Sequence, residues 1–291
     1  MSINYAFIGF GEAGRTFAGA ASGVSMSAFD VKTHAPETAP DIRDAYEALG
    51  VAGADGLQDA LASARCVFSL VTAGQALSAA KAVTSFISTD TIYCDMNSVA
   101  PETKRQAAEV IKDAGGLYAD VAIMAPVHPK ALDVPLLVSG SHADQASSAL
   151  TEFGFSAVAI QSGDIGAASA VKMIRSVMVK GIEALTAECM LAAEAAGVRA
   201  TVTQSLNASW PGTDWEAISD YNLDRMLTHG LRRAEEMGEV VKTLNGLGVS
   251  ADMSSATRHR QHLLGEFGPA SSAGLAMKLN HILNIQKDAS S

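Results

Sequence analysis

The chain has 291 residues, a formal net charge of −10, and 48% hydrophobic and 18% charged residues. These values are typical of a globular protein and leave room for two domains. The acidic balance argues against nucleic acid or an anionic membrane surface as a partner, so we expect neither. The three cysteines, Cys66, Cys94 and Cys189, lack C-x-x-C spacing and predict neither a disulfide framework nor a metal site. Together with the lack of a secretory-signal pattern, they favour a cytoplasmic protein.

The N-terminal residues combine an apolar run, a glycine-rich turn and a second short run that ends in an acid. Residues 3–8 predict a buried strand, G-F-G-E-A-G follows at 9–14, and a helical segment leads to a strand at 26–30. In this G-x-G-x-x-G pattern the first glycine permits a tight turn, the second admits a pyrophosphate, and the third lets the helix approach the strand. The pattern predicts a dinucleotide-binding unit whose helix N-terminus faces the phosphates. The alternative is a tight turn that binds no ligand.

The acid that ends the second run bears on the choice of cofactor. Asp30 follows Gly9 at about the spacing, roughly 20 residues, at which a carboxylate accepts hydrogen bonds from ribose hydroxyls. A carboxylate there repels a 2′-phosphate and favours NAD, whereas Lys32 and His34 just beyond it offset part of that repulsion and leave NADP open. The residues expected to bind the cofactor are Gly9, Phe10, Gly11, Glu12, Ala13, Gly14, Asp30, Lys32, Thr72 and Ala73.

Further apolar runs alternate with helical segments through the N-terminal half. The runs predicted as strands are 66–71, 91–95, 117–123, 135–139 and 155–160, and the segments predicted as helices are 40–49, 55–64, 75–86, 101–114 and 143–153. This alternation predicts a Rossmann-type, doubly wound parallel sheet over residues 1–163. Ligands of such sheets bind at the carboxyl ends of the strands, so the loops that follow the strands are candidates for lining the site.

The remaining residues, 164–291, predict an all-α domain. Residues 166–196 contain no proline and place Val171, Ile174, Met178, Ile182 and Leu185 at helical spacing, with a separate polar stripe of Lys172, Ser176, Lys180 and Glu183. A helix of that length spans about 45 Å, enough to connect two domains. The later segments predicted as helices are 201–208, 214–228, 230–246, 252–264 and 271–285.

This order of parts resembles the β-hydroxyacid dehydrogenase family, which includes 6-phosphogluconate and 3-hydroxyisobutyrate dehydrogenases. The resemblance rests on G-F-G-E-A-G, on D-M-N-S-V-A-P at 95–101, similar to the family's substrate-binding segment, and on G-A-A-S-A-V-K-M at 166–173. It implies an NAD(P)-dependent dehydrogenase in which Lys172 is the catalytic lysine. It also implies that the C-terminal helices close over the substrate and form the interface of a homodimer.

The chain departs from the family's pattern at two positions that would hold the substrate. Ser176 stands where the family usually has asparagine, and D-V-A-I-M-A-P at 120–126 lacks the serine and both glycines of the family's D-A-P-V-S-G-G stretch. The substrate is therefore expected to differ from the familiar small β-hydroxyacids. R-R-A-E-E-M at 232–237 is similar to a segment of a less characterised branch with a distinctive C-terminal domain.

The chemistry expected of Lys172 is proton transfer. An alcohol that loses hydride to a nicotinamide also loses a proton, and a lysine accepts it only if its pKa falls well below the free value of about 10.4. Partial burial and the positive nicotinamide ring both lower that pKa. The alternative is a solvated lysine on an amphipathic helix, and Lys180 is expected to be structural or peripheral.

The substrate is expected to be a small acidic molecule. Arg225, His229, Arg232, Arg233 and Glu236 share one helical stripe if the helix continues through Gly230; the stripe is either an ion-paired surface or a clamp for a carboxylate or phosphate. The residues expected to bind substrate are Asn97, Ser98, Met124, Ser176, His229, Arg232 and Arg233. Decarboxylation of a β-keto product stays open, as do two other functions: imine reduction, and dinucleotide binding without catalysis.

Overall fold

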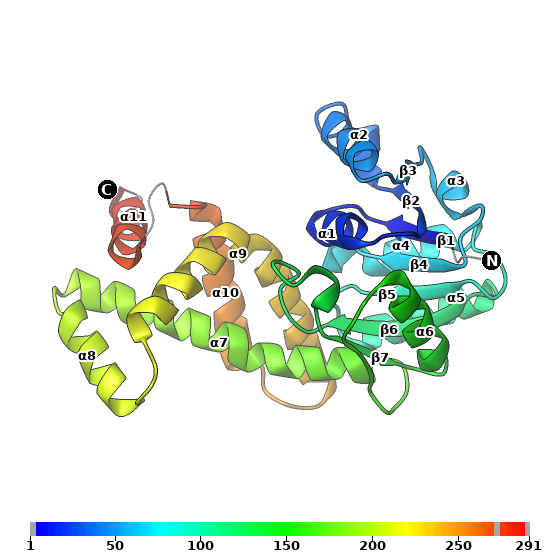
Figure 1. Ribbon diagram of the computed structural model, residues 1–291. Helices are drawn as coiled ribbons and strands as arrows, with labels where there is room; N and C mark the ends of the chain where they lie inside the picture. The colour runs from blue at the N-terminus through cyan, green and yellow to red at the C-terminus, as the bar shows by residue number, and fades with distance from the viewer. Residues whose placement is uncertain (1–3, 271–273, 289–291) are drawn as a thin grey trace. The chain divides into compact units, whose positions relative to one another are not determined.

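The computed structural model describes residues 4–270 and 274–288, which form two compact units, Met1–Met173 and Ile174–Ser291. The first unit is an α/β sheet with helices on both faces, and the second consists of helices (Figure 1). The sequence-based boundary at 163 precedes the long helix α7 (Ala167–Ala195), whereas the division between the units falls within that helix.

The first unit holds eight strands in the order β3-β2-β1-β4-β5-β6-β7-β8. All neighbouring strands are parallel except β6 and β7, which pair antiparallel, so the predicted Rossmann-type sheet is confirmed as a mostly parallel one. The strands are β1 (Asn4–Ile8), β2 (Ser25–Phe29), β3 (Ala52–Gly53), β4 (Cys66–Ser69), β5 (Ile92–Asp95), β6 (Leu117–Ile123), β7 (Leu136–Ser139) and β8 (Val158–Ile160). The sequence did not predict β3, because two residues are too few to show a periodicity.

Helices cover both faces of the sheet, and the pleat of the strands divides the core between them. Tyr5 and Phe7 of β1 pack on the face of α1, α2 and α6, while Ala6 and Ile8 pack on the face of α3, α4 and α5. These helices and the short 3-10 turns of the unit are α1 (Glu12–Ala20), α2 (Ala39–Ala48), α3 (Leu57–Leu61), α4 (Ala76–Val83), α5 (Pro101–Asp113), α6 (Ala143–Phe153), η1 (Val31–His34), η2 (Ala73–Gln75) and η3 (Ala131–Asp133). The carboxyl ends of the parallel strands thus open onto the loops that carry the candidate site.

The second unit continues α7 and adds α8 (Arg199–Ser209), α9 (Trp215–Gly246), α10 (Asp252–Phe267) and α11 (Leu275–Asp288). The segments predicted at 214–228 and 230–246 form one helix, because α9 runs unbroken through Gly230. A side-chain carbon at Gly230 would lie 2.3 Å from the carbonyl oxygen of Gln261 and 2.7 Å from the Cα of Gly265. Gly230 therefore permits the close crossing of α9 and α10, which outweighs its cost of about 1 kcal/mol within a helix.

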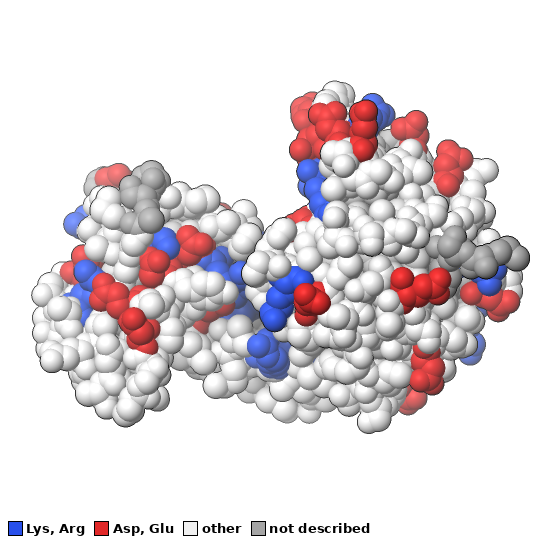
Figure 2. Space-filling model, viewed as in Figure 1, with Lys and Arg blue, Asp and Glu red and all other residues white. Residues whose placement is uncertain are grey.

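The long helix α7 presents its apolar stripe outward. Val171, Ile174, Met178, Ile182 and Leu185 are 37% to 65% exposed, whereas Ser176, Lys180 and Glu183 of the polar stripe are buried. Amphipathic helices usually bury the apolar stripe, so this arrangement is the reverse of the common one. Acidic and basic side chains are interspersed over the part of the surface that Figure 2 views. Among the described residues, no helix is long and apolar enough to span a membrane.

Candidate active site

The glycine turn between β1 and α1 has the geometry that a dinucleotide requires. Gly9 has a φ of +86°, and a side-chain carbon there would lie 2.6 Å from the carbonyl oxygen of Leu70. A side-chain carbon at Gly14 would lie 3.2 Å from the carbonyl oxygen of Gly9, so the third glycine allows α1 to approach the turn. One at Gly11 would meet nothing within 4 Å, which leaves open space at the N-terminus of α1. The residues present therefore fit a bound pyrophosphate.

Asp30 fixes the turn against the end of β2. Its carboxylate accepts hydrogen bonds from the backbone N–H of Phe10 at 2.7 Å and from that of Lys32 at 2.9 Å. Asp30 is buried and Lys32 is exposed. A carboxylate is thus held immediately beneath the glycine turn. Thr72 and Ala73, at the start of η2, follow β4 on the same edge of the sheet.

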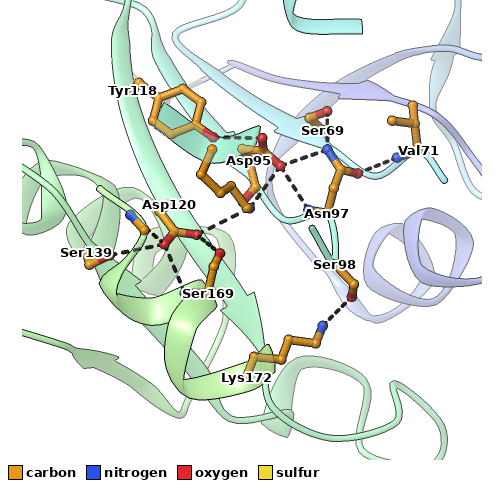
Figure 3. Close-up of polar contacts among 12 residues, drawn as sticks. Ser69, Val71, Asp95, Asn97, Ser98, Tyr118, Asp120, Ser139, Ser169 and Lys172 are labelled. Carbon is orange, nitrogen blue, oxygen red and sulfur yellow. Dashed lines mark hydrogen bonds and ion pairs between the residues drawn. The ribbon is translucent and has the colours of Figure 1, made fainter. Parts of the chain in front are cut away.

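Asn97 ties together the ends of β4 and β5. Its amide nitrogen donates to Ser69 Oγ at 2.9 Å and to Asp95 Oδ1 at 2.8 Å, and its amide oxygen accepts from the N–H of Val71 at 2.7 Å (Figure 3). These contacts hold the segment after β5, which carries Ser98, in a defined conformation. The structure therefore places the Asn97 side chain within the protein's own hydrogen-bond network.

A fully buried lysine lies between two fully buried carboxylates at this edge of the sheet. The Lys104 Nζ donates to the Asp95 backbone oxygen at 2.5 Å and to Asp95 Oδ1 at 3.0 Å, and it lies 3.3 Å from Asp120 Oδ1. Asp95 and Asp120 are register partners on β5 and β6, so both carboxylates point to one face of the sheet. Tyr118 donates to Asp95 Oδ2 at 2.7 Å. Burial, followed by the charges of these two carboxylates, raises the pKa of Tyr118 well above its usual value and keeps the phenol a donor.

Asp120 also caps the start of α7. Its Oδ2 accepts from the N–H groups of Gly166 at 3.1 Å and Ser169 at 3.0 Å, and its Oδ1 accepts from the Ser169 hydroxyl at 2.5 Å (Figure 3). Ser139 Oγ of β7 donates to Asp120 as well. A carboxylate at a helix N-terminus accepts hydrogen bonds from N–H groups that lack partners within the helix. It also interacts favourably with the positive end of the helix dipole.

The candidate catalytic lysine and the segment after β5 meet directly. Lys172 Nζ donates to Ser98 Oγ at 2.5 Å, and both residues are half-buried (Figure 3). The contact joins two predicted site residues 74 positions apart. Lys172 lies one helical turn after Ser169, so the capped start of α7 sets its position. Met124, also half-buried, follows β6 at the same edge of the sheet.

The other predicted substrate residues belong to the helical unit, where the structure separates them. Arg233 is buried and ion-paired with Glu183, while Arg232 is exposed, because adjacent residues of a helix point in directions about 100° apart. Ser176 is buried and accepts from Lys180 Nζ at 3.4 Å. Lys180 forms an ion pair with Glu236 at 2.9 Å, as expected of a structural lysine. His229 is half-buried on α9.

The sequence pattern does not predict Lys104 as a site residue, and it gives no role to Asp95 or Asp120. The helical spacing of α5 does contain a sign that Lys104 is buried. Lys104 occupies the same helical face as Ala107, Ala108 and Ile111, which are apolar and buried. A lysine at such a position predicts a buried ion pair. Its partners were harder to find, because only the register of β5 and β6 brings the two carboxylates side by side.

Comparison with known families agrees with this geometry. Residues 4–154 match the family model described as the NAD binding domain of 6-phosphogluconate dehydrogenase. The chain belongs to this family. Its first unit is an NAD(P)-binding domain, and residues 193–264 match a second model, described as a domain of unknown function. The predicted resemblance, including the distinctive C-terminal domain, is confirmed.

Solved structures of similar chains extend over nearly the whole length. A conserved hypothetical protein from Sinorhizobium meliloti 1021 is 33% identical over 98% of this chain and 97% of its own, with a TM-score of 0.74. A conserved protein of unknown function, described as structurally similar to 3-hydroxyacid dehydrogenases, is 30% identical over 91% of this chain and 97% of its own, with a TM-score of 0.69. A Mycobacterium tuberculosis 3-hydroxyisobutyrate dehydrogenase shares the fold at 18% identity, with coverage of 98% and 100% and a TM-score of 0.72.

Proposed function

We propose that this protein is an NAD(P)-dependent oxidoreductase that transfers hydride between the nicotinamide and the hydroxyl of a hydroxyacid, with Lys172 as general acid and base. The observation that carries the proposal is the 2.5 Å contact between Lys172 Nζ and Ser98 Oγ. It places an amine and a hydroxyl at the carboxyl edge of a sheet whose first turn fits a dinucleotide. Ligands of doubly wound sheets bind at this edge.

The proposed reaction divides between cofactor and protein. Bound NAD supplies the acceptor for hydride leaving the substrate carbon. The neutral amine of Lys172 takes the proton that leaves the hydroxyl oxygen, and the ammonium returns a proton to a carbonyl in the reverse direction. Ser98 Oγ accepts from Lys172 and so restricts the directions in which the amine can point. The substrate hydroxyl would lie within hydrogen-bond reach of both groups.

The substrate we propose is a hydroxyacid with a larger substituent than the familiar small ones. Met124 and Ser176 replace the serine and the asparagine that the family's pattern places around the substrate. A methionine side chain is apolar and adaptable, so it suits an apolar or aromatic group better than a carboxylate. Whether a β-keto product then loses carbon dioxide depends on where the substrate's carboxyl group lies.

The proposal is tested by following the reduction of NAD and of NADP with a panel of hydroxyacids that carry larger, aromatic or phosphorylated substituents. Oxidation of at least one member supports it. Reduction of cyclic imines, with no activity on any hydroxyacid, would replace it with an imine reductase. Tight dinucleotide binding with no turnover on either panel would leave a binding protein instead.

We also propose a homodimer formed through α7. Its exposed stripe, which includes Ile174, Met178 and Ile182, is apolar apart from the exposed Arg175 on the same face, and a two-fold axis would let this stripe pack against its own copy. A second copy of the chain is the occupant that this symmetry favours, because two identical apolar stripes would cover each other's exposed side chains.

Met178→Glu is expected to convert the dimer to a monomer, because it would bury one carboxylate from each copy in the interface. Met178 is 65% exposed, and Met253 on α10, at 64%, provides a matched control. Analytical ultracentrifugation of the wild type, Met178→Glu and Met253→Glu measures the result. A wild-type monomer, or a Met178→Glu protein that stays dimeric, would contradict the proposed interface.

A further inference from the structure

Lys104, Asp95 and Asp120 form a buried cluster of charged side chains at the carboxyl edge of the sheet. Lys104 is the positively charged member of this cluster. Its side chain is 0% exposed, and its ammonium contacts both carboxylates. Asp95 and Asp120 are direct neighbours on β5 and β6, where like charges repel. Removing an ammonium group from water costs free energy even when it is paired. The position of Lys104 between the two carboxylates therefore calls for an explanation.

Each carboxylate holds a different part of the proposed active site. Asp95 Oδ1 accepts from the backbone N–H and the side-chain amide of Asn97, which precedes Ser98. Asp120 accepts from the N–H groups of Gly166 and Ser169 at the start of α7, one turn before Lys172. Lys104 thus connects, through two buried contacts, the two elements whose side chains meet as Lys172 and Ser98.

We propose that Lys104 is a positioning residue, which holds the segment carrying Ser98 and the start of α7 in the register that brings Lys172 onto Ser98. The inference rests on the proposed function, because that function gives Lys172 its role in proton transfer. Lys104 itself is fully buried, and its ammonium acts on the pair through Asp95 and Asp120, the two residues that it contacts. Without the ammonium, repulsion between Asp95 and Asp120 would push the two elements apart.

The test measures how readily Lys172 reacts, which requires no substrate. Reductive methylation of the full-length protein, followed by peptide mass spectrometry, gives the rate at Lys172 in the wild type and in Lys104→Gln. We expect this rate to rise about two- to tenfold, because losing the net contribution of one hydrogen bond enlarges the released population of Lys172 by that factor. Lys112→Gln, an exposed lysine on the same helix α5, should leave the rate unchanged.

Two further variants separate positioning from simple destabilisation. Ile111→Ala removes a buried apolar side chain from α5 without touching either carboxylate, and should lower the melting temperature while leaving the rate at Lys172 unchanged. Asp120→Asn leaves Asp95 and Lys104 as a charge-balanced pair and retains an amide oxygen for α7, so it should fold even where Lys104→Gln does not. It too should raise the rate, because Lys104 no longer attracts the cap of α7.

An unchanged rate at Lys172 in folded Lys104→Gln or in Asp120→Asn would overturn the proposal. An equal rise of the labelling rate at Lys172 in Ile111→Ala would also overturn it, when each variant is labelled at the same number of degrees below its own melting temperature. Because the readout is labelling rather than turnover, it is independent of whether the proposed reaction is correct. Positioning without catalysis would show as a raised labelling rate together with no turnover on any substrate.

Discussion

Lys172→Ala is expected to lower turnover by about 10²–10⁴-fold, the usual contribution of a general acid or base, and to leave the dissociation constant of the dinucleotide unchanged. The alanine has no group that can take a proton from the substrate hydroxyl. Its effect on the fold should be small, because Lys172 is half-buried and its observed partner, Ser98, remains accessible to water. Steady-state kinetics with a substrate from the hydroxyacid panel, together with dinucleotide titration, measure both quantities.

Two companion variants sharpen this expectation. Ser98→Ala keeps the amine and removes the hydroxyl that orients it, so its loss of turnover should be smaller than that of Lys172→Ala. Lys112→Ala removes an exposed lysine of α5 and should have no effect on turnover. Unimpaired turnover in Lys172→Ala would remove this lysine from the mechanism, whatever the other variants show.

Alanine at the first two glycines of the turn is expected to separate the fold from dinucleotide binding. Gly11→Ala should keep the wild-type melting temperature, because the added methyl group meets nothing within 4 Å. It should weaken dinucleotide binding by at least about tenfold, or 1.4 kcal/mol, because the methyl group enters the space that a pyrophosphate needs.

Gly9→Ala should instead damage both properties. Its backbone has a φ of +86°, which costs an alanine about 1–2 kcal/mol, and its methyl group would lie 2.6 Å from the Leu70 carbonyl oxygen. Because that neighbour is backbone, the chain directly after β4 would have to shift. Thermal denaturation and dinucleotide titration of the two variants provide the comparison. Normal binding by Gly11→Ala would show that the dinucleotide does not lie against this turn.

The cofactor half of the site could be predicted from the sequence because its signals are local. The spacing of Gly9, Gly11 and Gly14 and the acid at Asp30 lie within one βαβ unit, and each depends on its neighbours along the chain. The sheet was predictable for the same reason, since apolar runs mark its longer strands. The two-residue β3 and the antiparallel pairing of β6 with β7 leave no such mark.

The substrate half was less predictable because it depends on contacts between distant residues. Helical spacing placed Arg232 and Arg233 on one stripe, but the structure buries Arg233 against Glu183 and exposes Arg232. The spacing also does not predict which stripe of α7 is buried. In the structure the polar stripe is buried, and it forms ion pairs such as that of Lys180 with Glu236. Pairing across helices decided which stripe is buried, and no single-helix pattern contains that information.

The most direct test of the central claim is to titrate the protein with NADH and with NADPH and to monitor binding by the fluorescence of the bound nicotinamide. The glycine turn predicts saturable binding. Asp30, held beneath the turn by the N–H groups of Phe10 and Lys32, predicts that NADH binds more tightly than NADPH by about tenfold, or 1.4 kcal/mol. Equal or tighter binding of NADPH would contradict the role given to Asp30, and no saturable binding of either nucleotide would contradict the claim itself.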